Sequence, residues 1–324
     1  MRLLVVLFLL LNGSISTVFA ADYEARREQA LELLRDYPRQ YRVITDGKLF
    51  FYDECRFSNV ELRTTDAVSG ELNRIKLEIY RPKHQNGTAT VLIIPPTGGK
   101  NIIDGRMANV FCNAGLDSVI VKSWKRLDQI EEDMSKQEDA LIRAAAAIRL
   151  TADYITETFR DSNGISNSIG IMGTSLGAMF ASTVLAIDPR FKAAFLAVGG
   201  SPLSEVLATT KQRVARKVRE TQMRANNLVS AEEYQEILKE RLRIDLDVLV
   251  TPKKSLALKM LTAEGDGSVP TKTQIQLWES WGKPERFVEK SSLGHPAAIF
   301  NTYWKYREEI RKFFLESFNN TPKI

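Results

Sequence analysis

The sequence is poor in the residues that build disulfide-dense or zinc-binding domains. Only 2 Cys and 2 His occur among 324 residues. Neither cysteine has a histidine or a second cysteine at the spacing of a zinc site, so we expect no metal and no other cofactor. With 18 Gly, the chain also lacks the composition of a collagen-like protein. Only one long apolar run is present, which excludes a membrane protein with several spans.

An excess of charge of one sign is also missing. Lys+Arg 45 against Asp+Glu 40 gives a net charge of +5, and we find no nucleic-acid-reading motif, so we expect no nucleic-acid partner. Neither G-x-G-x-x-G nor G-x-x-x-x-G-K-[ST] occurs, which excludes the common nucleotide-binding loops. What remains is an ordinary globular composition with 44% hydrophobic residues, too apolar for a disordered chain. The length suits one large α/β domain or two small ones.

The single apolar run lies at the N-terminus. Met1 and Arg2 precede an uninterrupted apolar stretch, and Val18 and Ala20 place small residues at the −3 and −1 positions of a cleavage site. This pattern predicts a signal peptide over residues 1–20, cleaved after Ala20, and a secreted or periplasmic protein. The alternative is an uncleaved anchor, but the run is shorter than the roughly 20 residues that span a membrane. We therefore expect no stable membrane anchor after cleavage.

Export would place Cys55 and Cys112 in an oxidising compartment, where a disulfide is allowed. Their pairing cannot be derived from the sequence. The alternative is two small buried apolar side chains, and both possibilities remain open at this point.

Strands alternate with helices over most of the chain. Continuous apolar runs, typical of buried parallel strands, are followed by helical segments over 135–159 and Leu176–Ile187. This alternation predicts a mostly parallel central sheet flanked by helices. Before it, residues 21–71 are predicted to form an N-terminal helix, over 22–42, and a strand extension. The four apolar runs are Val91–Ile94, Ser118–Val121, Ile169–Met172 and Ala194–Val198.

Residues 201–250 interrupt this alternation. Ser201 and Pro202 are typical of a helix start, and Ser230 is positioned to cap a second helix. A single helix is enough to connect two parallel strands, so two successive helices in this segment predict a helical cap. The core is then formed by residues 72–200 and 251–324, which end in a predicted helix from about Thr302 to Phe318.

The first predicted cap helix is rich in basic residues. If these face a pocket, they favour an anionic substrate. If they lie opposite Val214 and Val218, they form a solvated helix face, which is the more usual arrangement. The residues are Lys211, Arg213, Arg216, Lys217, Arg219 and Arg224.

A G-x-S-x-G motif, Gly173 to Gly177, follows one of the apolar strands and precedes a helix. In that context the sharp turn exposes the Ser175 hydroxyl at the carboxyl edge of the sheet, and the helix N-terminus favours developing negative charge. Ser175 is therefore the candidate nucleophile. The alternative is an ordinary strand-to-helix turn.

A serine hydroxyl needs a base, and the chain offers two histidines. His295 follows the last predicted strand, whereas His84 lies in a polar stretch that is typical of an exposed loop. His295 is thus the candidate base. Asp266, in the loop after a strand near 256–261, is the candidate for the carboxylate that orients it, with Glu264 as the alternative.

Two backbone N–H groups should stabilise an oxyanion. We expect one from Leu176, directly after the serine, and the other from Thr97 or Gly98, in the glycine-containing loop after Val91–Ile94. The alternative for that loop is a simple glycine turn.

Over about residues 72–318 the chain resembles the α/β-hydrolase superfamily, including its esterases and dienelactone-hydrolase-like members. The resemblance rests on Gly173–Gly177, on the Asp-x-x-Val-Pro of Asp266–Pro270 and on Gly294-His295, in the order Ser, Asp, His. It implies Ser175 as nucleophile, His295 as base and then acid, and Asp266 as its orienting partner. The cap lies where this superfamily places substrate-selecting lids. One departure is Pro96-Thr97, where many members have His-Gly.

Together these features predict a serine hydrolase that cleaves a carboxylic ester through an acyl-enzyme. Alternatives on the same fold are a serine peptidase, an acyltransferase and a non-catalytic binding protein. The expected partner is a small-molecule or acyl-ester substrate. The sequence does not predict which ester is cleaved or how many copies of the chain assemble.

Overall fold

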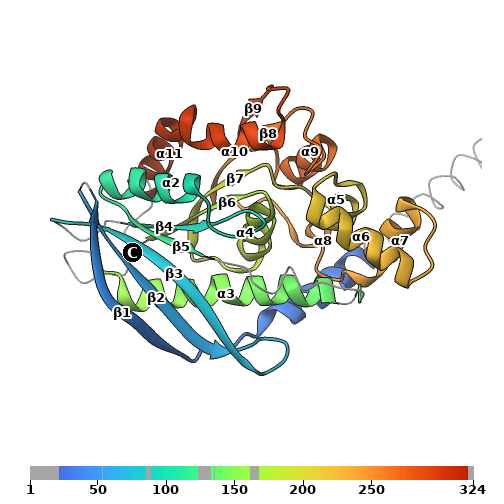
Figure 1. The fold of residues 1–324 in the computed structure, drawn as a ribbon, viewed down its shortest axis with the longest axis horizontal. Coiled ribbons are helices and arrows are strands. Elements are labelled where there is room, and N and C mark those ends of the chain that lie inside the picture. The colour runs from blue at the N-terminus through green and yellow to red at the C-terminus, as the bar shows by residue number, and fades with distance from the viewer. Residues whose placement is uncertain are drawn as a thin grey trace, which may run out of the picture.

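The computed structural model describes residues 22–52, 54–84, 89–122, 133–134, 136–160 and 168–319. A sheet of nine strands runs through its centre in the order β1-β2-β3-β5-β4-β6-β7-β8-β9 (Figure 1). Strands β5, β4, β6, β7, β8 and β9 are parallel, while β1, β2 and β3 add antiparallel pairs at one edge. The strands are β1 (Tyr41–Tyr52), β2 (Cys55–Thr65), β3 (Leu72–Pro82), β4 (Ala89–Ile94), β5 (Asp117–Val121), β6 (Ser168–Thr174), β7 (Phe191–Ala197), β8 (Ala257–Ala263) and β9 (Glu285–Glu289).

Helices cover both faces of this sheet. In Figure 1, α2, α10 and α11 lie on one side and α3 lies on the other. The mostly parallel sheet between helical layers confirms the predicted fold class. Besides a helix over residues 22–35, the helices are α2 (Ile102–Asn113), α3 (Lys136–Thr158), α4 (Leu176–Ile187), α5 (Leu203–Thr209), α6 (Arg213–Ala225), α7 (Ala231–Arg241), α8 (Leu246–Leu249), α9 (Thr271–Ser280), α10 (His295–Trp304) and α11 (Arg307–Asn319).

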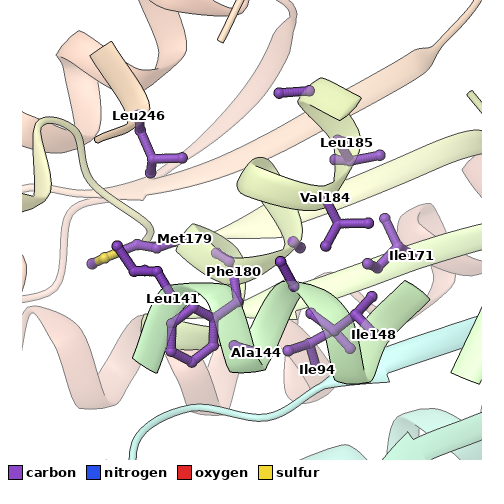
Figure 2. Packing of buried hydrophobic residues seen from close by; sticks show 14 of the residues in the cluster. Ile94, Leu141, Ala144, Ile148, Ile171, Met179, Phe180, Val184, Leu185 and Leu246 are labelled. Carbon is purple, nitrogen blue, oxygen red and sulfur yellow. The ribbon is translucent and has the colours of Figure 1, made fainter. Parts of the chain in front are cut away.

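Side-chain alternation along the central strands creates a hydrophobic core on each face of the sheet. On β4, Leu92 and Ile94 belong to the core beneath α3 and α4, whereas Val91 and Ile93 belong to the core beneath α2 and α11. Because successive side chains of a strand point to opposite faces, a strand covered on both sides must be apolar throughout. Figure 2 shows the first core, where side chains from α3 and α4 pack over the strands.

The N-terminal segment differs from the prediction. The helix predicted over 22–42 ends at residue 35, and strand β1 begins at Tyr41. Pro38 lies in the intervening stretch, and proline disfavours helical backbone both at its own position and at the residue before it. Strands β1 and β2 then extend the same sheet as the core strands. The predicted signal peptide, residues 1–20, lies outside the described residues, and its cleavage after Ala20 stays a prediction.

A disulfide joins Cys55 at the start of β2 to Cys112 near the end of α2, with the two Cα atoms 6.1 Å apart. The structure thus decides between the two possibilities that the sequence left open. Both cysteines are buried in the core between the sheet and α2. The bond connects the antiparallel edge of the sheet to a helix that packs on the parallel strands.

The segment between β7 and β8 contains four helices, α5 to α8. The first predicted helix is interrupted at residues 210–212, where Thr210 Oγ1 donates a hydrogen bond of 2.6 Å to the carbonyl of Ser268. The side chain of Gln212 then accepts from the N–H of Ala215, 2.7 Å away, and starts α6. Ser230 caps α7 as predicted, with its hydroxyl accepting from the N–H of Glu233.

A buried polar network holds these helices against α3. Tyr234 of α7 donates to the side-chain carbonyl of Gln222 on α6 at 2.7 Å, and the amide of Gln137 on α3 donates to the same oxygen at 2.9 Å. Burial raises the pKa of Tyr234 to about 12, so its phenol remains a donor at neutral pH. The network therefore fixes α6 and α7 over the N-terminal end of α3.

The C-terminal part also differs in detail. Instead of one helix from about Thr302 to Phe318, the chain forms α10 and α11, with a break at residues 305–306. His295, which follows the last strand as predicted, is the first residue of α10. Among the described residues, no helix is long and apolar enough to cross a membrane.

Candidate active site

Ser175 lies in the turn that joins β6 to α4. Its backbone has φ 56° and ψ −122°, a conformation that costs energy in any residue other than glycine. The Ser175 N–H donates a 2.8 Å hydrogen bond to the carbonyl of Ala197 at the end of β7, which holds the turn against the neighbouring strand. The side chain thus stands at the carboxyl edge of the sheet, where the G-x-S-x-G motif predicts it.

The glycines on either side of Ser175 are needed because backbone atoms approach them closely. A Cβ atom on Gly177 would lie 2.2 Å from the carbonyl oxygen of Ile94 and 2.4 Å from that of Pro95. One on Gly173 would lie 2.6 Å from the carbonyl oxygen of Gly177. These neighbours are backbone atoms of β4, of the residue that follows it and of α4, so neither position can accept a larger residue without displacing the turn.

Two other segments bring His295 and Asp266 to Ser175. The loop after β8 positions Asp266, and His295 follows Gly294, whose φ of 54° turns the chain into α10. His295 Nε2 is 2.9 Å from Ser175 Oγ, and His295 Nδ1 is 2.6 Å from Asp266 Oδ2. The three predicted residues therefore form one continuous hydrogen-bonded chain, although 120 residues separate the serine from the histidine.

The carboxylate of Asp266 is fixed by donors on both oxygens. Its Oδ1 accepts from the N–H groups of Ser268 and Val269, at 2.8 and 3.0 Å. Its Oδ2 accepts from the side-chain amide of Gln274 at 2.8 Å, beside the bond with His295. The side chain of Asp266 is fully buried, so these donors replace the water that would otherwise stabilise its charge.

Gln274 is a site residue that sequence reasoning missed. It lies in the first turn of α9 and is fully buried. Its amide nitrogen donates to Asp266 and to the carbonyl of Val269, while its Oε1 accepts from the N–H of Ala263. The only signal in the sequence is a polar residue eight positions after Asp266, which does not distinguish it from an exposed helix residue.

Replacing Gln274 with methionine should lower kcat/KM by about 10- to 100-fold with little change in KM. The reason is the loss of one hydrogen bond to a charged group, worth about 1.5–3 kcal/mol. Steady-state kinetics on a chromogenic ester measures both constants. Gln276→Met, on the same helix, is the matched control, because Gln276 is not among the described hydrogen-bond partners of Asp266. Equal kinetics for the two variants would exclude a positioning role for Gln274.

The two alternative residues lie away from this chain of hydrogen bonds. The side chain of His84 is 83% exposed and its Nε2 is 3.4 Å from Glu54. Glu264 is exposed, and its backbone N–H pairs with the carbonyl of Glu289 on β9. Of the two histidines and the two acidic residues considered, the structure therefore brings His295 and Asp266 to the serine.

Of the three predicted oxyanion donors, two belong to residues that line the cavity beside Ser175, and one does not. Leu176 is the first residue of α4, so its N–H belongs to the helix-terminal groups that lack an intrahelical acceptor. Thr97 lines the same cavity as Ser175 and Leu176. Gly98, with φ 92°, is exposed in the adjoining turn and is not among the residues described as lining the cavity. Leu176 and Thr97 are therefore the better placed pair, and their role stays a prediction.

A cavity of about 130 Å³ opens over Ser175, and we call it the cap pocket. Its floor includes Ser175, Leu176 and Met179 of the core, and its roof is formed by α5 and α6. None of the described residues that line it is charged. The roof residues are Leu203, Val206, Leu207, Val214, Ala215 and Val218.

The basic residues of the first predicted cap helix are not among the described lining residues of the cap pocket. Val214 and Val218 line it instead. Arg219 donates to the carbonyls of Leu207, Ala208 and Thr210, and Arg216 pairs with Glu220 on the surface of α6. The structure therefore supports the solvated-face interpretation of these charges over the anion-binding one.

No group of three or more His, Cys, Asp or Glu suited to a metal ion occurs in the described part of the chain.

Solved structures similar to this chain include several hydrolases. Acetyl xylan esterase 1 from Thermoanaerobacterium sp. JW/SL YS485 matches with a TM-score of 0.66 at 14% identity, over 92% of this chain and 94% of that one. The chain has the α/β-hydrolase fold. The acetyl xylan esterase from Paenibacillus sp. R4 matches this hydrolase fold with a TM-score of 0.63 at 16% identity, over the same shares of the two chains.

A prolyl endopeptidase shares the hydrolase fold as well. It matches with a TM-score of 0.58 at 14% identity, over 85% of this chain and 38% of the longer peptidase chain. No family model matches the sequence, and no curated protein matches it. At 14–16% identity the likeness concerns the fold, so any statement about chemistry depends on the geometry of the site.

Proposed function

We propose that this protein is a serine hydrolase that cleaves carboxylic esters. The observation that supports this best is the hydrogen-bonded chain from Ser175 through His295 to Asp266, built on a strained turn that presents the serine to the cap pocket. Three groups from three separate segments meet at hydrogen-bond distance, and this is the arrangement that activates a serine for acyl transfer.

In the proposed reaction Ser175 Oγ attacks the ester carbonyl while its proton passes to His295 Nε2. Asp266, bonded to Nδ1, keeps the proton-free nitrogen directed at the serine and stabilises the imidazolium that forms. The N–H groups of Leu176 and Thr97 stabilise the oxyanion. His295 then protonates the leaving alcohol, which gives an acyl-enzyme. Water attacks that intermediate, with His295 acting as base once more, and releases the acid.

The uncharged lining of the cap pocket favours an ester over a peptide as substrate. An enzyme that recognises a peptide terminus needs a charged partner for it, and the described lining residues supply none. An acyltransferase would use the same acyl-enzyme and replace the water by an alcohol. A binding protein on this scaffold would not need the bond between Ser175 and His295.

The test is the intact mass of the protein after incubation with a fluorophosphonate, which reacts with activated serines. We expect one adduct on the wild type and none on Ser175→Ala. A parallel assay with p-nitrophenyl esters and peptide p-nitroanilides separates an esterase from a peptidase, and added alcohols reveal acyl transfer. An adduct that persists in Ser175→Ala, or a folded wild type that forms none, would refute the assignment.

We also propose that the protein is secreted or periplasmic. The apolar N-terminal segment and the disulfide between Cys55 and Cys112 both support export to an oxidising compartment. N-terminal sequencing of the protein recovered outside the cytoplasm should begin at Ala21.

A further inference from the structure

The cap pocket reaches Ser175, so the group that it accepts influences which esters are cleaved. Its roof consists of aliphatic side chains from α5 and α6, and its floor includes Leu141, Met179 and Phe180. Figure 2 shows these three floor residues close together, on α3 and α4. A substrate group in this cavity would therefore contact mainly aliphatic surface.

Several polar groups of the cap pocket are engaged within the protein. Thr210 donates to the carbonyl of Ser268, and the side chain of Gln212 caps α6. The amide nitrogen of Gln137 donates to Gln222 and Tyr234. A charged substrate group entering this cavity would lose its water and meet no opposite charge among the described lining residues, which is a large cost.

The size of the cavity sets a limit on the group. An apolar protein cavity of about 150 Å³ accommodates benzene, a molecule of six carbons. The cap pocket, at about 130 Å³, is slightly smaller. An acetyl group would leave most of it unfilled, and a chain of ten carbons would not fit within it.

We propose that the cap pocket binds an uncharged aliphatic group of about four to six carbons, on either the acyl or the alcohol side of the ester. This proposal rests on the proposed ester hydrolysis and specifies its substrate class.

Two series of uncharged esters test the proposal on the full-length mature protein. The first is p-nitrophenyl acetate, butyrate, hexanoate and decanoate, which varies the acyl chain. The second is ethyl, butyl, hexyl and decyl acetate, which varies the alcohol. In one of the two series kcat/KM should rise about fourfold per added methylene up to four to six carbons and then fall. The series that shows this optimum identifies the side of the ester that occupies the pocket.

A matched pair of variants tests whether the cap pocket causes the preference. Ala215→Phe places a ring in the roof, and Ala225→Phe makes the same change at an exposed position of α6. Ala215→Phe should reduce the ratio of kcat/KM between the best and the shortest ester to about one. Ala225→Phe should keep the wild-type ratio. A succinyl ester, with a carboxylate at the end of a four-carbon chain, should be cleaved at least tenfold more slowly than the butyryl ester.

Each outcome has a distinct meaning. A wild type that takes the fluorophosphonate on Ser175 and cleaves acetates, yet shows no optimum in either series, refutes the substrate class and leaves the ester hydrolase intact. The same holds if Ala215→Phe folds and keeps the wild-type ratio. A folded wild type with neither adduct nor turnover refutes the proposed function and this proposal together. The wild-type series needs no variant, so the proposal is tested even if Ala215→Phe does not fold.

Discussion

Replacing Ser175 with alanine should lower kcat/KM for ester hydrolysis by about 10⁴- to 10⁶-fold and leave the melting temperature nearly unchanged. The hydroxyl accepts the acyl group in the proposed reaction, so without it only binding and oxyanion stabilisation remain. The fold should persist because a methyl group fits the space of the side chain and the backbone N–H still bonds to Ala197. Initial rates on an activated ester, with circular dichroism for folding, measure both quantities.

His295→Ala should reduce the rate almost as much, and the double variant should be no slower than the slower single one. Groups that act as one unit lose their joint effect when any member is removed. The chain offers a clean control, since its second histidine is exposed and lies far from the site: His84→Ala should keep full activity. Losses that multiply in the double variant would show that Ser175 and His295 act independently, against the proposed mechanism.

Removing the disulfide should destabilise the protein strongly without touching the site. The bond closes a loop with a sequence separation of 57 residues. The chain-entropy model then predicts that the variant with Cys55→Ala and Cys112→Ala loses up to about 4 kcal/mol of unfolding free energy. Urea unfolding of the oxidised wild type and of the variant measures the difference.

Reduction of the wild type with a thiol reagent is the companion experiment and should approach the stability of the double variant. Activity should persist while either protein is folded, because the bond joins β2 to α2 and neither cysteine lies at the triad. Two free thiols in the oxidised protein, or equal stability with and without the bond, would contradict this expectation.

The fold and the identity of the three site residues were predictable because each depends on local patterns. The apolar runs at β4, β6 and β7 are bounded by turn residues. A strand that is buried on both faces must consist mostly of apolar residues, so such a run identifies it. The G-x-S-x-G motif has a steric basis that holds for any sequence, since Gly177 faces two backbone carbonyls. Because the chain has two histidines, the base that activates Ser175 had to be chosen from two candidates.

What the sequence did not predict depends on contacts between distant segments. The first helix of the cap breaks at Thr210 because its hydroxyl bonds to Ser268, nearly 60 residues away. Gln274 belongs to the site because α9 packs it against Asp266. A glutamine in a helix is usually exposed, so its residue type does not predict this burial. The pairing of Cys55 with Cys112 requires that β2 and α2 be neighbours, which only the assembled sheet establishes.

The position of the cap helices in the chain has a consequence for the evolution of this protein. They connect β7 to β8, which are adjacent parallel strands, so the chain leaves the sheet at the carboxyl end of β7 and re-enters it beside the start of the same strand. Insertions or exchanges between α5 and α8 can therefore reshape the roof over the serine without moving Ser175 or His295. Under the proposed function, selection can diversify the ester that is recognised while the reaction centre is inherited unchanged, and grafting this segment between relatives is a route to altered selectivity.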